Sequence, residues 1–112
     1  HANEELLHRI AGDDMVHGIT IACGGFFGPQ GRQLRLPLAD PEANKKIESF
    51  EFEGHRICNF EMESSALAGL SLLMGHKAMT CCMVIANRVA GRANPNYKNS
   101  IDSLIKTVLD RI

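Results

Sequence analysis

The sequence predicts an α/β fold in which helices cover the faces of a sheet. Segments with apolar residues at helical spacing alternate along the 112 residues with short apolar runs rich in β-branched residues. One of these runs, Met79–Ala86, is continuously apolar, which is typical of a parallel strand covered on both faces. A chain of this length is expected to form one small domain.

The first third of the chain predicts a helix, a strand and a loop. Apolar residues on one side indicate a helix over Glu4–Ala11, which Gly12 is expected to end. Met15–Cys23 has the β-branched content of a strand. Gly24–Arg32 follows as a glycine-rich loop. Because the loop lacks the Gly-Lys-Ser/Thr ending of a P-loop, we do not expect it to cradle nucleotide phosphates.

The middle of the chain predicts a short helix between two irregular stretches. Two prolines indicate extended or turn structure over Leu34–Glu42. A helix is expected over Asn44–Phe50, with Asn44 near its cap. Phe52–Gly54 is then expected to form a turn.

A strand and a helix follow in direct succession. Arg56–Asn59 predicts the strand, and Ser64–Met74 predicts the helix, which ends at Gly75. The apolar residues that recur at helical spacing in this helix are Ala66, Leu67, Leu70, Leu73 and Met74. We expect them to face inward.

After the apolar run of residues 79–86, the chain predicts a loop and a last helix. Val89–Asn99 contains glycine, proline and several asparagines and arginines, which indicates a mobile loop. Ser100 is the expected cap of the last helix. That helix carries one apolar stripe, expected to be a packing face: Ile101, Leu104, Ile105, Val108, Leu109 and Ile112.

Composition excludes several classes of function. With 45% hydrophobic residues, 22% charged residues and a net charge of −1, the chain lacks the basic character of a nucleic-acid-binding protein. No apolar run reaches the length of about 18 residues that a membrane span needs. The adjacent Cys81 and Cys82 fit no zinc or disulfide framework, so reduced core cysteines and a cytoplasmic location are expected. The five histidines show no metal spacing, and we expect no metal.

The stretch Asn59–Ser65 places two carboxylates and a thioether at the junction between a predicted strand and the helix that follows it. In open α/β folds, this edge of the sheet is where ligands bind. A carboxylate such as that of Glu61 or Glu63 only accepts hydrogen bonds, so it can hold the two adjacent hydroxyls of a ribose. The alternative is that both carboxylates merely favour the positive N-terminus of the helix.

The glycine-rich loop carries a second candidate group. Gln30 and Arg32 lie two residues apart, beside Phe26 and Phe27. The amide offers a donor and an acceptor side by side, which matches O2 and N3–H of uracil, while a guanidinium donates toward O4. The alternative is an ordinary surface loop with exposed polar residues and core phenylalanines.

The two motifs Glu-Met-Glu-Ser-Ser (61–65) and Phe-Phe-Gly-Pro-Gln-Gly-Arg (26–32) together resemble the nucleoside phosphorylases, and the uridine phosphorylases in particular. The resemblance covers nearly the whole chain but only the C-terminal part of such a subunit. It implies that residues 1–112 are the C-terminal part of a single nucleoside phosphorylase domain, with a mixed central sheet flanked by helices. Since the chain begins at His1 and not at methionine, we expect it to begin inside a longer product.

The resemblance also implies roles for individual residues. Gln30 and Arg32 match the residues that read uracil, and Phe26 matches the aromatic residue at the base. The implied substrate-binding set is completed by Glu61, Met62, Glu63, Ile85, Ala86 and Arg88. The family pattern reads Phe-Tyr-x-Gly-Gln-x-Arg, so the Gly28-Pro29 order of this chain departs from it and predicts a local difference in the loop backbone.

Asn87-Arg88 separates two branches of the family. Purine phosphorylases and the related nucleosidases carry Ser-Asp here, and the aspartate protonates purine N7. The matching pair Asn87-Arg88 is that of uridine phosphorylases. An arginine is a poor proton donor, but it suits a pyrimidine carbonyl that gathers charge. The alternative is a salt-bridged surface arginine.

The implied reaction is reversible phosphorolysis of uridine to uracil and ribose 1-phosphate, with Gln30, Arg32 and Arg88 as the catalytic residues of this chain. Inorganic phosphate is the co-substrate, and no cofactor is implied. The family's phosphate-binding arginines lie in the absent N-terminal portion, so this stretch alone is expected to be inactive. In that family, the segment that corresponds to residues 89–99 closes over the base.

The implied partners are the N-terminal remainder of the same chain and further copies, as a dimer or a trimer of dimers, without nucleic acid or membrane. Two rival functions remain open. One is a purine-directed phosphorylase or nucleosidase, against which Arg88 argues. The other is a non-catalytic nucleoside-binding domain of the same fold, against which intact Gln30, Arg32 and Glu63 argue.

Overall fold

The computed structural model describes all of residues 1–112 and is a mixed α/β structure with four α-helices and small sheets. The main sheet has the order β1-β3-β2, in which β1 (Ile19–Ala22) runs parallel to β3 (His55–Glu61) and β2 (Glu51–Phe52) runs antiparallel to it. The remaining elements are α1 (Glu4–Ile10), η1 (Gly28–Gln30), α2 (Ala43–Ser49), α3 (Ser64–Leu73), β4 (Ala86–Asn87), β5 (Arg92–Ala93) and α4 (Tyr97–Arg111). The α/β class therefore agrees with the sequence-based prediction.

The predicted strand Met15–Cys23 is correct only in its second half. Strand β1 pairs with β3 from Ile19 onward, and the register shifts between Ile19 and Thr20. The residues before Ile19 have no partner strand, and Val16 is 86% exposed. Within the paired part, the Thr20 hydroxyl donates to the Asn59 side chain at 2.8 Å and joins the two strands.

The strand predicted over Arg56–Asn59 is longer in the structure and is part of a hairpin. Strand β3 extends to Glu61, and β2 precedes it across the expected turn. Glu53 and Gly54 form this turn with φ values of 51° and 76°. Positive φ at both turn residues matches the twist of the flanking strands, which is why a two-residue hairpin forms here.

The helices predicted around this hairpin are present. Helix α2 matches the predicted Asn44–Phe50 within a residue, but its N-cap is Glu42 and not Asn44. The Asn44 side chain instead donates to the main-chain carbonyl of Gly31 in the glycine-rich loop. Helix α3 begins at Ser64 as predicted and ends just before Gly75.

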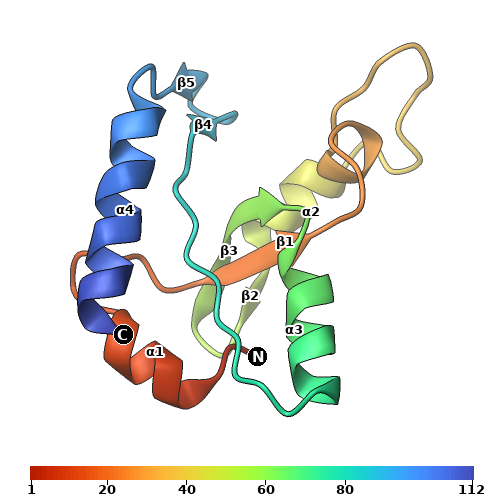
Figure 1. Ribbon diagram of the computed structural model, residues 1–112. Helices are drawn as coiled ribbons and strands as arrows, with labels where there is room; N and C mark the ends of the chain where they lie inside the picture. Colours follow the sequence, from red (N-terminus) through yellow and green to blue (C-terminus); the bar gives the residue numbers. More distant parts are fainter.

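The prediction of a buried strand over Met79–Ala86 is wrong. No main-chain group of residues 79–84 has a main-chain hydrogen-bond partner, and only Ala86 enters a strand, the two-residue β4. Figure 1 shows the segment as an extended chain that passes between α4 and the sheet. Cys81 and Met83 are half-buried, whereas Cys82 and Val84 are exposed. A continuous apolar run indicates that both faces should be buried, but only one face is covered here.

The predicted loop Val89–Asn99 contains more regular structure than expected. It includes β5, which pairs with β4, and the first turn of α4. Helix α4 starts at Tyr97 because the Asn94 side chain accepts a hydrogen bond from Asn96 N at 2.9 Å and closes a turn around Pro95. Ser100 therefore lies inside the helix and is not its cap.

The apolar stripe of α4 is covered only in part. Ile101, Leu104 and Val108 are half-buried. The other members of the stripe are exposed, namely Ile105, Leu109 and Ile112. The expectation that the whole stripe is a packing face is therefore only half met within this chain.

Arg111 ties the last helix to the first. Its guanidinium donates to the carbonyl of Ile10 at 2.8 Å and to both carboxylate oxygens of Asp14 at 2.9 and 3.0 Å. The carbonyl of Ile10 is one of those left without a partner at the C-terminal end of α1. The side chain of Ile10 is the one buried apolar residue of the structure. These contacts join the two ends of the chain.

The structure exposes more surface than a compact monomer of its size. Its accessible surface is 8787 Å², against about 6,100 Å² for a compact monomer of this mass. Its radius of gyration is 15.4 Å, against about 13 Å. Helix α3 has no buried residue, so its predicted inward face points to solvent. The four helices and the small sheet therefore form an open framework.

The cysteines are free, as expected, but they are not core residues. Cys58 and Cys82 are exposed, and Cys23 and Cys81 are half-buried. The expectation of core cysteines is wrong because the sheet is covered on too few sides to bury them. No helix is both long and apolar enough to cross a membrane.

Candidate functional site

The candidate site lies where β1 and β3 end side by side. Cys23 N, just beyond β1, donates to the carbonyl of Glu61 at 3.0 Å. The glycine-rich loop and the turn into α3 therefore start at the same edge of the sheet, as expected for the carboxyl ends of parallel strands.

Gln30 is the buried polar residue of the structure, with 5% of its surface exposed. It ends the 3-10 turn η1, and its main-chain N–H donates to the Phe27 carbonyl at 3.0 Å. Phe26 and Phe27 are 52% and 49% exposed. This is the reverse of an ordinary surface loop with exposed polar groups and core phenylalanines, because here the amide is inside and the rings are outside.

Arg32 fixes the orientation of the Gln30 amide. Its guanidinium lies over the Phe26 ring with 3.7 Å from Cζ to the ring centroid, and it donates to the Phe26 carbonyl. The same Nη1 lies 3.3 Å from Gln30 Oε1. Since a guanidinium has only donors, the oxygen of the amide must face it and Nε2 must point away. Phe26 thus contacts Arg32 on one face and packs nearly at right angles to the ring of Phe27.

Arg88 reaches the same loop from the opposite end of the chain. Its guanidinium donates to the main-chain carbonyl of Gln30 and lies over the Phe60 ring, 4.9 Å from the centroid. Arg88 forms no ion pair, so it is not the salt-bridged surface arginine of the alternative interpretation. Desolvation and the positive charge of Arg32 lower the pKa of Arg88 from its ordinary value.

Glu61 caps helix α3. Its carboxylate accepts hydrogen bonds from Glu63 N at 2.9 Å and Ser64 N at 2.7 Å, and from the Ser64 hydroxyl. Desolvation raises the pKa of Glu61, but these hydrogen bonds outweigh it, and the net pKa lies below its ordinary value. For Glu61, the structure therefore supplies the helix-terminus role that the sequence left as an alternative.

Glu63 and Met62 remain available beside this cap. The Glu63 side chain is exposed and makes no hydrogen bond or ion pair within the chain. Met62 is 42% exposed. Of the two carboxylates, Glu63 is thus the one whose oxygens are all unused.

Ile85 and Ala86 lie on the segment that leads to Arg88. The Ile85 carbonyl accepts a hydrogen bond from Asn94 N at 2.8 Å, and Ala86 pairs with Ala93 in the β4–β5 hairpin. Both are exposed. Arg88 is the residue of this segment that is brought into contact with the glycine-rich loop.

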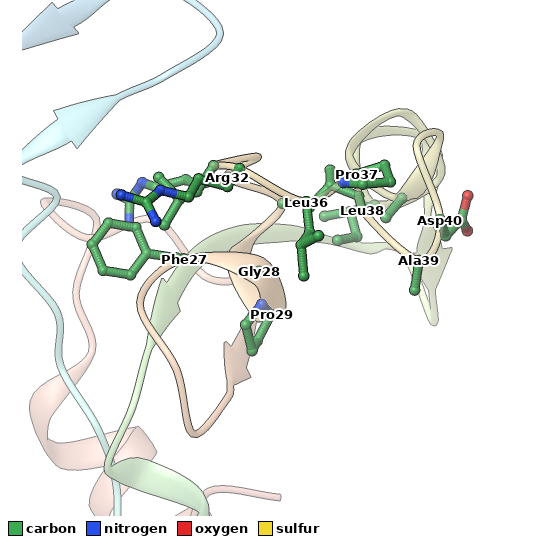
Figure 2. Close-up of a pocket in the computed structure, with 14 residues that line it drawn as sticks. Phe27, Gly28, Pro29, Arg32, Leu36, Pro37, Leu38, Ala39 and Asp40 are labelled. Carbon is green, nitrogen blue, oxygen red and sulfur yellow. The ribbon is translucent and has the colours of Figure 1, made fainter.

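A hollow adjoins the glycine-rich loop. It has a volume of about 910 Å³ and is walled by the loop, by residues 34–40 and by the start of α2. Figure 2 shows Phe27 and Arg32 at one end of this hollow and Asp40 at the other. Among the predicted site residues only Arg32 contributes to it, and most of its wall is apolar. Apart from Arg32, the predicted base and ribose residues therefore lie outside this hollow.

Two residues that the sequence did not single out belong to the site. Phe60 supplies the ring under Arg88. Its position directly before Glu61, on the same strand end, was the available signal. Asn44 donates to the Gly31 carbonyl at 3.2 Å. Nothing in the sequence indicated that contact, because it joins residues in separate elements.

No family model, no curated protein and no solved structure matches this chain. The arrangement of its side chains therefore has to support any functional assignment.

Proposed function

We propose that these residues form the base and ribose sites of a uridine phosphorylase, which exchanges uracil for phosphate on the C1′ atom of ribose. The observation that carries this proposal is the row of hydrogen-bonding groups formed by Arg32 and Gln30. Arg32 Nη1 lies beside Gln30 Oε1 at 3.3 Å, and Gln30 Nε2 follows on the same amide. Both hydrogens of Arg32 Nη1 are directed at Gln30 Oε1 and the Phe26 carbonyl, so an N–H of Nη2 or Nε supplies the outer donor, and the row reads donor, acceptor, donor.

This row is complementary to one edge of uracil. O4, N3–H and O2 of uracil read acceptor, donor, acceptor, so Arg32 would meet O4 and the Gln30 amide would meet N3–H and O2. Cytosine has a donor in place of O4 and an acceptor at N3, and it would mismatch the row twice. Flipping the Gln30 amide does not remove the mismatch, because Nε2 would then face the donors of Arg32. The hydrogen bond between the two side chains thus favours uracil over cytosine.

The charge around this row suits a departing base. As phosphate attacks C1′, the C1′–N1 bond breaks and its electron pair passes to N1 and is shared with O2 and O4. Arg32 and Arg88 bring two positive charges to one loop, and no carboxylate pairs with either. Each donor aimed at such developing charge is worth about 3 kcal/mol in the transition state.

The ribose is assigned to the turn after β3. The Glu61 carboxylate is already used at the N-terminus of α3, where it accepts a hydrogen bond from the main-chain N–H of Glu63. The free carboxylate of Glu63 is the acceptor for the 2′- and 3′-hydroxyls, and Met62 packs under the sugar. Ile85 and Ala86 are assigned to the same substrate surface, on the segment that ends at Arg88.

The rest of the active site is proposed to lie outside these residues. The phosphate-binding groups would come from an N-terminal remainder of the chain, and a homo-oligomer with one or more further copies is proposed to cover exposed apolar faces such as that of α3. The protein would act in the cytoplasm, where its four free cysteines stay reduced. Inorganic phosphate is the co-substrate, and no cofactor is needed.

The test is a comparison of nucleosides with the complete protein. Uridine, cytidine, inosine and adenosine are each incubated with and without phosphate, and release of the free base is followed. We expect base release from uridine that requires phosphate, and nearly none from the other three nucleosides. Fast turnover of inosine, or base release without phosphate, would support the purine-directed rivals and overturn the assignment. Tight binding of uridine without turnover would indicate a non-catalytic nucleoside-binding domain.

A further inference from the structure

Two side chains from distant parts of the chain hold the turn that carries Gln30. Arg88 donates to the main-chain carbonyl of Gln30, and Asn44 Nδ2 donates to the next carbonyl, that of Gly31, at 3.2 Å. Two consecutive carbonyls of this turn therefore accept hydrogen bonds, one from Asn44 in α2 and the other from Arg88 in the segment after β4. The orientation of the Gln30 side chain depends on the backbone between these two contacts.

The contact with Asn44 is close as well as polar. Gly31 has a φ of 69°, and a Cβ atom on Gly31 would lie 2.3 Å from Asn44 Oδ1. Only a glycine allows the Asn44 amide to lie so near the turn. The amide therefore fixes both the position of the Gly31 carbonyl and the space around it.

Asn44 contributes little to its own helix. The N-cap of α2 is Glu42, and the Glu42 main-chain N–H is bound by Asp40 Oδ1 at 3.0 Å. The one hydrogen bond of the Asn44 side chain is to the glycine-rich loop. Asparagine also has a lower helix propensity than alanine, lysine or glutamate. Its presence in the first turn of α2 is explained by the loop and not by the helix.

We propose that Asn44 is a positioning residue for Gln30, acting through the Gly31 carbonyl together with Arg88 on the Gln30 carbonyl. This inference rests on the proposed function, because it assigns Asn44 to base recognition in that site. Asn44 does not touch the base. It holds the turn in the conformation in which the Gln30 amide meets Arg32.

The first test is kinetic. In the complete protein, Asn44→Ala is expected to lower kcat/KM for uridine about three- to tenfold, the usual worth of one hydrogen bond. Asn44→Asp has the same shape but no donor, so its carboxylate faces the Gly31 carbonyl and the loss should be larger. Alanine has a higher helix propensity than asparagine, which offsets the lost hydrogen bond, so the melting temperature of Asn44→Ala should change little. Lys45→Ala, on the neighbouring exposed position of the helix, is the matched control and should change kcat/KM by less than about twofold.

The second test asks whether Asn44 acts through Gln30. In a Gln30→Ala background, adding Asn44→Ala should cause almost no further loss, because the group that it positions is gone. An equal loss of kcat/KM in both backgrounds would overturn the proposal. So would the absence of any loss in the single variant.

The third test does not depend on the reaction. The amides of Gln30 and Gly31 are bonded within the loop at 3.0 and 2.8 Å, so their hydrogen exchange reports on the turn. Exchange should be faster in Asn44→Ala and unchanged in Lys45→Ala. Unchanged exchange in Asn44→Ala would overturn the positioning role even if uridine is the substrate. If the wild-type protein leaves uridine intact, the proposed function is overturned. Faster hydrogen exchange in Asn44→Ala would in that case still show that Asn44 positions the loop.

Discussion

Replacing the Gln30 amide by a carboxylate separates base recognition from loop stability. Gln30→Glu keeps the size of the side chain and the oxygen that faces Arg32 Nη1 at 3.3 Å. It replaces the Nε2 donor, which we assign to O2 of uracil, by a second acceptor. The main-chain bond from Arg88 to the Gln30 carbonyl does not involve the side chain and should remain.

The size of the effect follows from two losses. Removing one donor from the developing negative charge costs about 3 kcal/mol in the transition state, which is about 100-fold in rate. The introduced carboxylate also repels the departing uracil anion, while Arg32 and Arg88 offset part of that repulsion. We therefore expect kcat/KM for uridine to fall by at least about 100-fold.

The Gln30→Glu substitution should not lower the stability of the protein. The carboxylate is buried at some cost, but it gains two nearby guanidinium groups. Because the residue at position 30 is only 5% exposed, the desolvation cost of the carboxylate offsets most of its attraction to the guanidinium groups, and the net gain is about 1 kcal/mol or less. The melting temperature of Gln30→Glu should therefore be equal to that of the wild type or slightly higher. Gln33→Glu makes the same charge change at the exposed position directly after the loop and serves as the control.

The assay is initial-rate phosphorolysis of uridine at saturating phosphate, with a thermal melt of each variant. Gln33→Glu should retain kcat/KM within about twofold. If Gln30→Glu also stays within about threefold of the wild type, Gln30 does not read the base. If its activity falls only in proportion to a lowered melting temperature, Gln30 supports the loop and has no direct role.

Three further changes test other parts of the site. Glu63→Gln should reduce turnover of uridine about tenfold more than that of 2′-deoxyuridine, since only uridine has the 2′-hydroxyl that the carboxylate would accept from; equal losses on the two substrates would contradict a contact with that hydroxyl. The lowered pKa of Glu61 means that its cap of α3 is fully stabilising above pH 4.5 and is lost as the pH falls through the lower folded value. Between about pH 6 and about pH 3, the melting temperature should therefore fall more steeply in wild type than in Glu61→Gln, and parallel curves would exclude this role. Gly31→Ala should destabilise the protein by at least about 1–2 kcal/mol, because φ is 69° there and the added Cβ meets Asn44; denaturant unfolding that matches wild type would contradict the close packing.

Local patterns in the sequence predicted the helices better than they predicted the strands and their pairing. Helices α2 and α3 lie within a residue or two of the predicted ranges, because their period and their turns are encoded in adjacent residues. The polar residues that follow β1 and β3 were also singled out, although the pairing of the two strands was not predicted. What the sequence did not indicate was how those residues interact. The hydrogen bond of Arg32 to the Gln30 amide and the cap formed by Glu61 depend on side-chain orientation, which spacing does not determine.

The boundaries and the cap that were missed depend on two local turns and on one contact between separate elements. Ser100 is a good capping residue, but Asn94 closes a turn four residues before the expected start and α4 begins there. The hairpin of β2 and β3 needs the paired positive φ values of Glu53 and Gly54, and Glu-Gly is a less common signal for them than Asn-Gly or Asp-Gly. Asn44 was expected at a helix cap because asparagine is common there. In the structure, its amide has a better partner in the Gly31 carbonyl.

The wrong strand at Met79–Ala86 and the exposed helix faces have one physical cause. An apolar pattern records which side chains are suited to burial, but it does not say which segment covers them. In this structure the segment 79–84 has no strand beside it, and the apolar residues of α3 and half of those on α4 face solvent. The surface of 8787 Å² exceeds that of a compact monomer by about 2,700 Å². That excess is in the range of the area that obligate interfaces bury. The proposed remainder of the chain and the proposed further copies would cover these same residues, and a strand laid against residues 79–84 would supply the missing main-chain partners beside Arg88 and the loop that it holds.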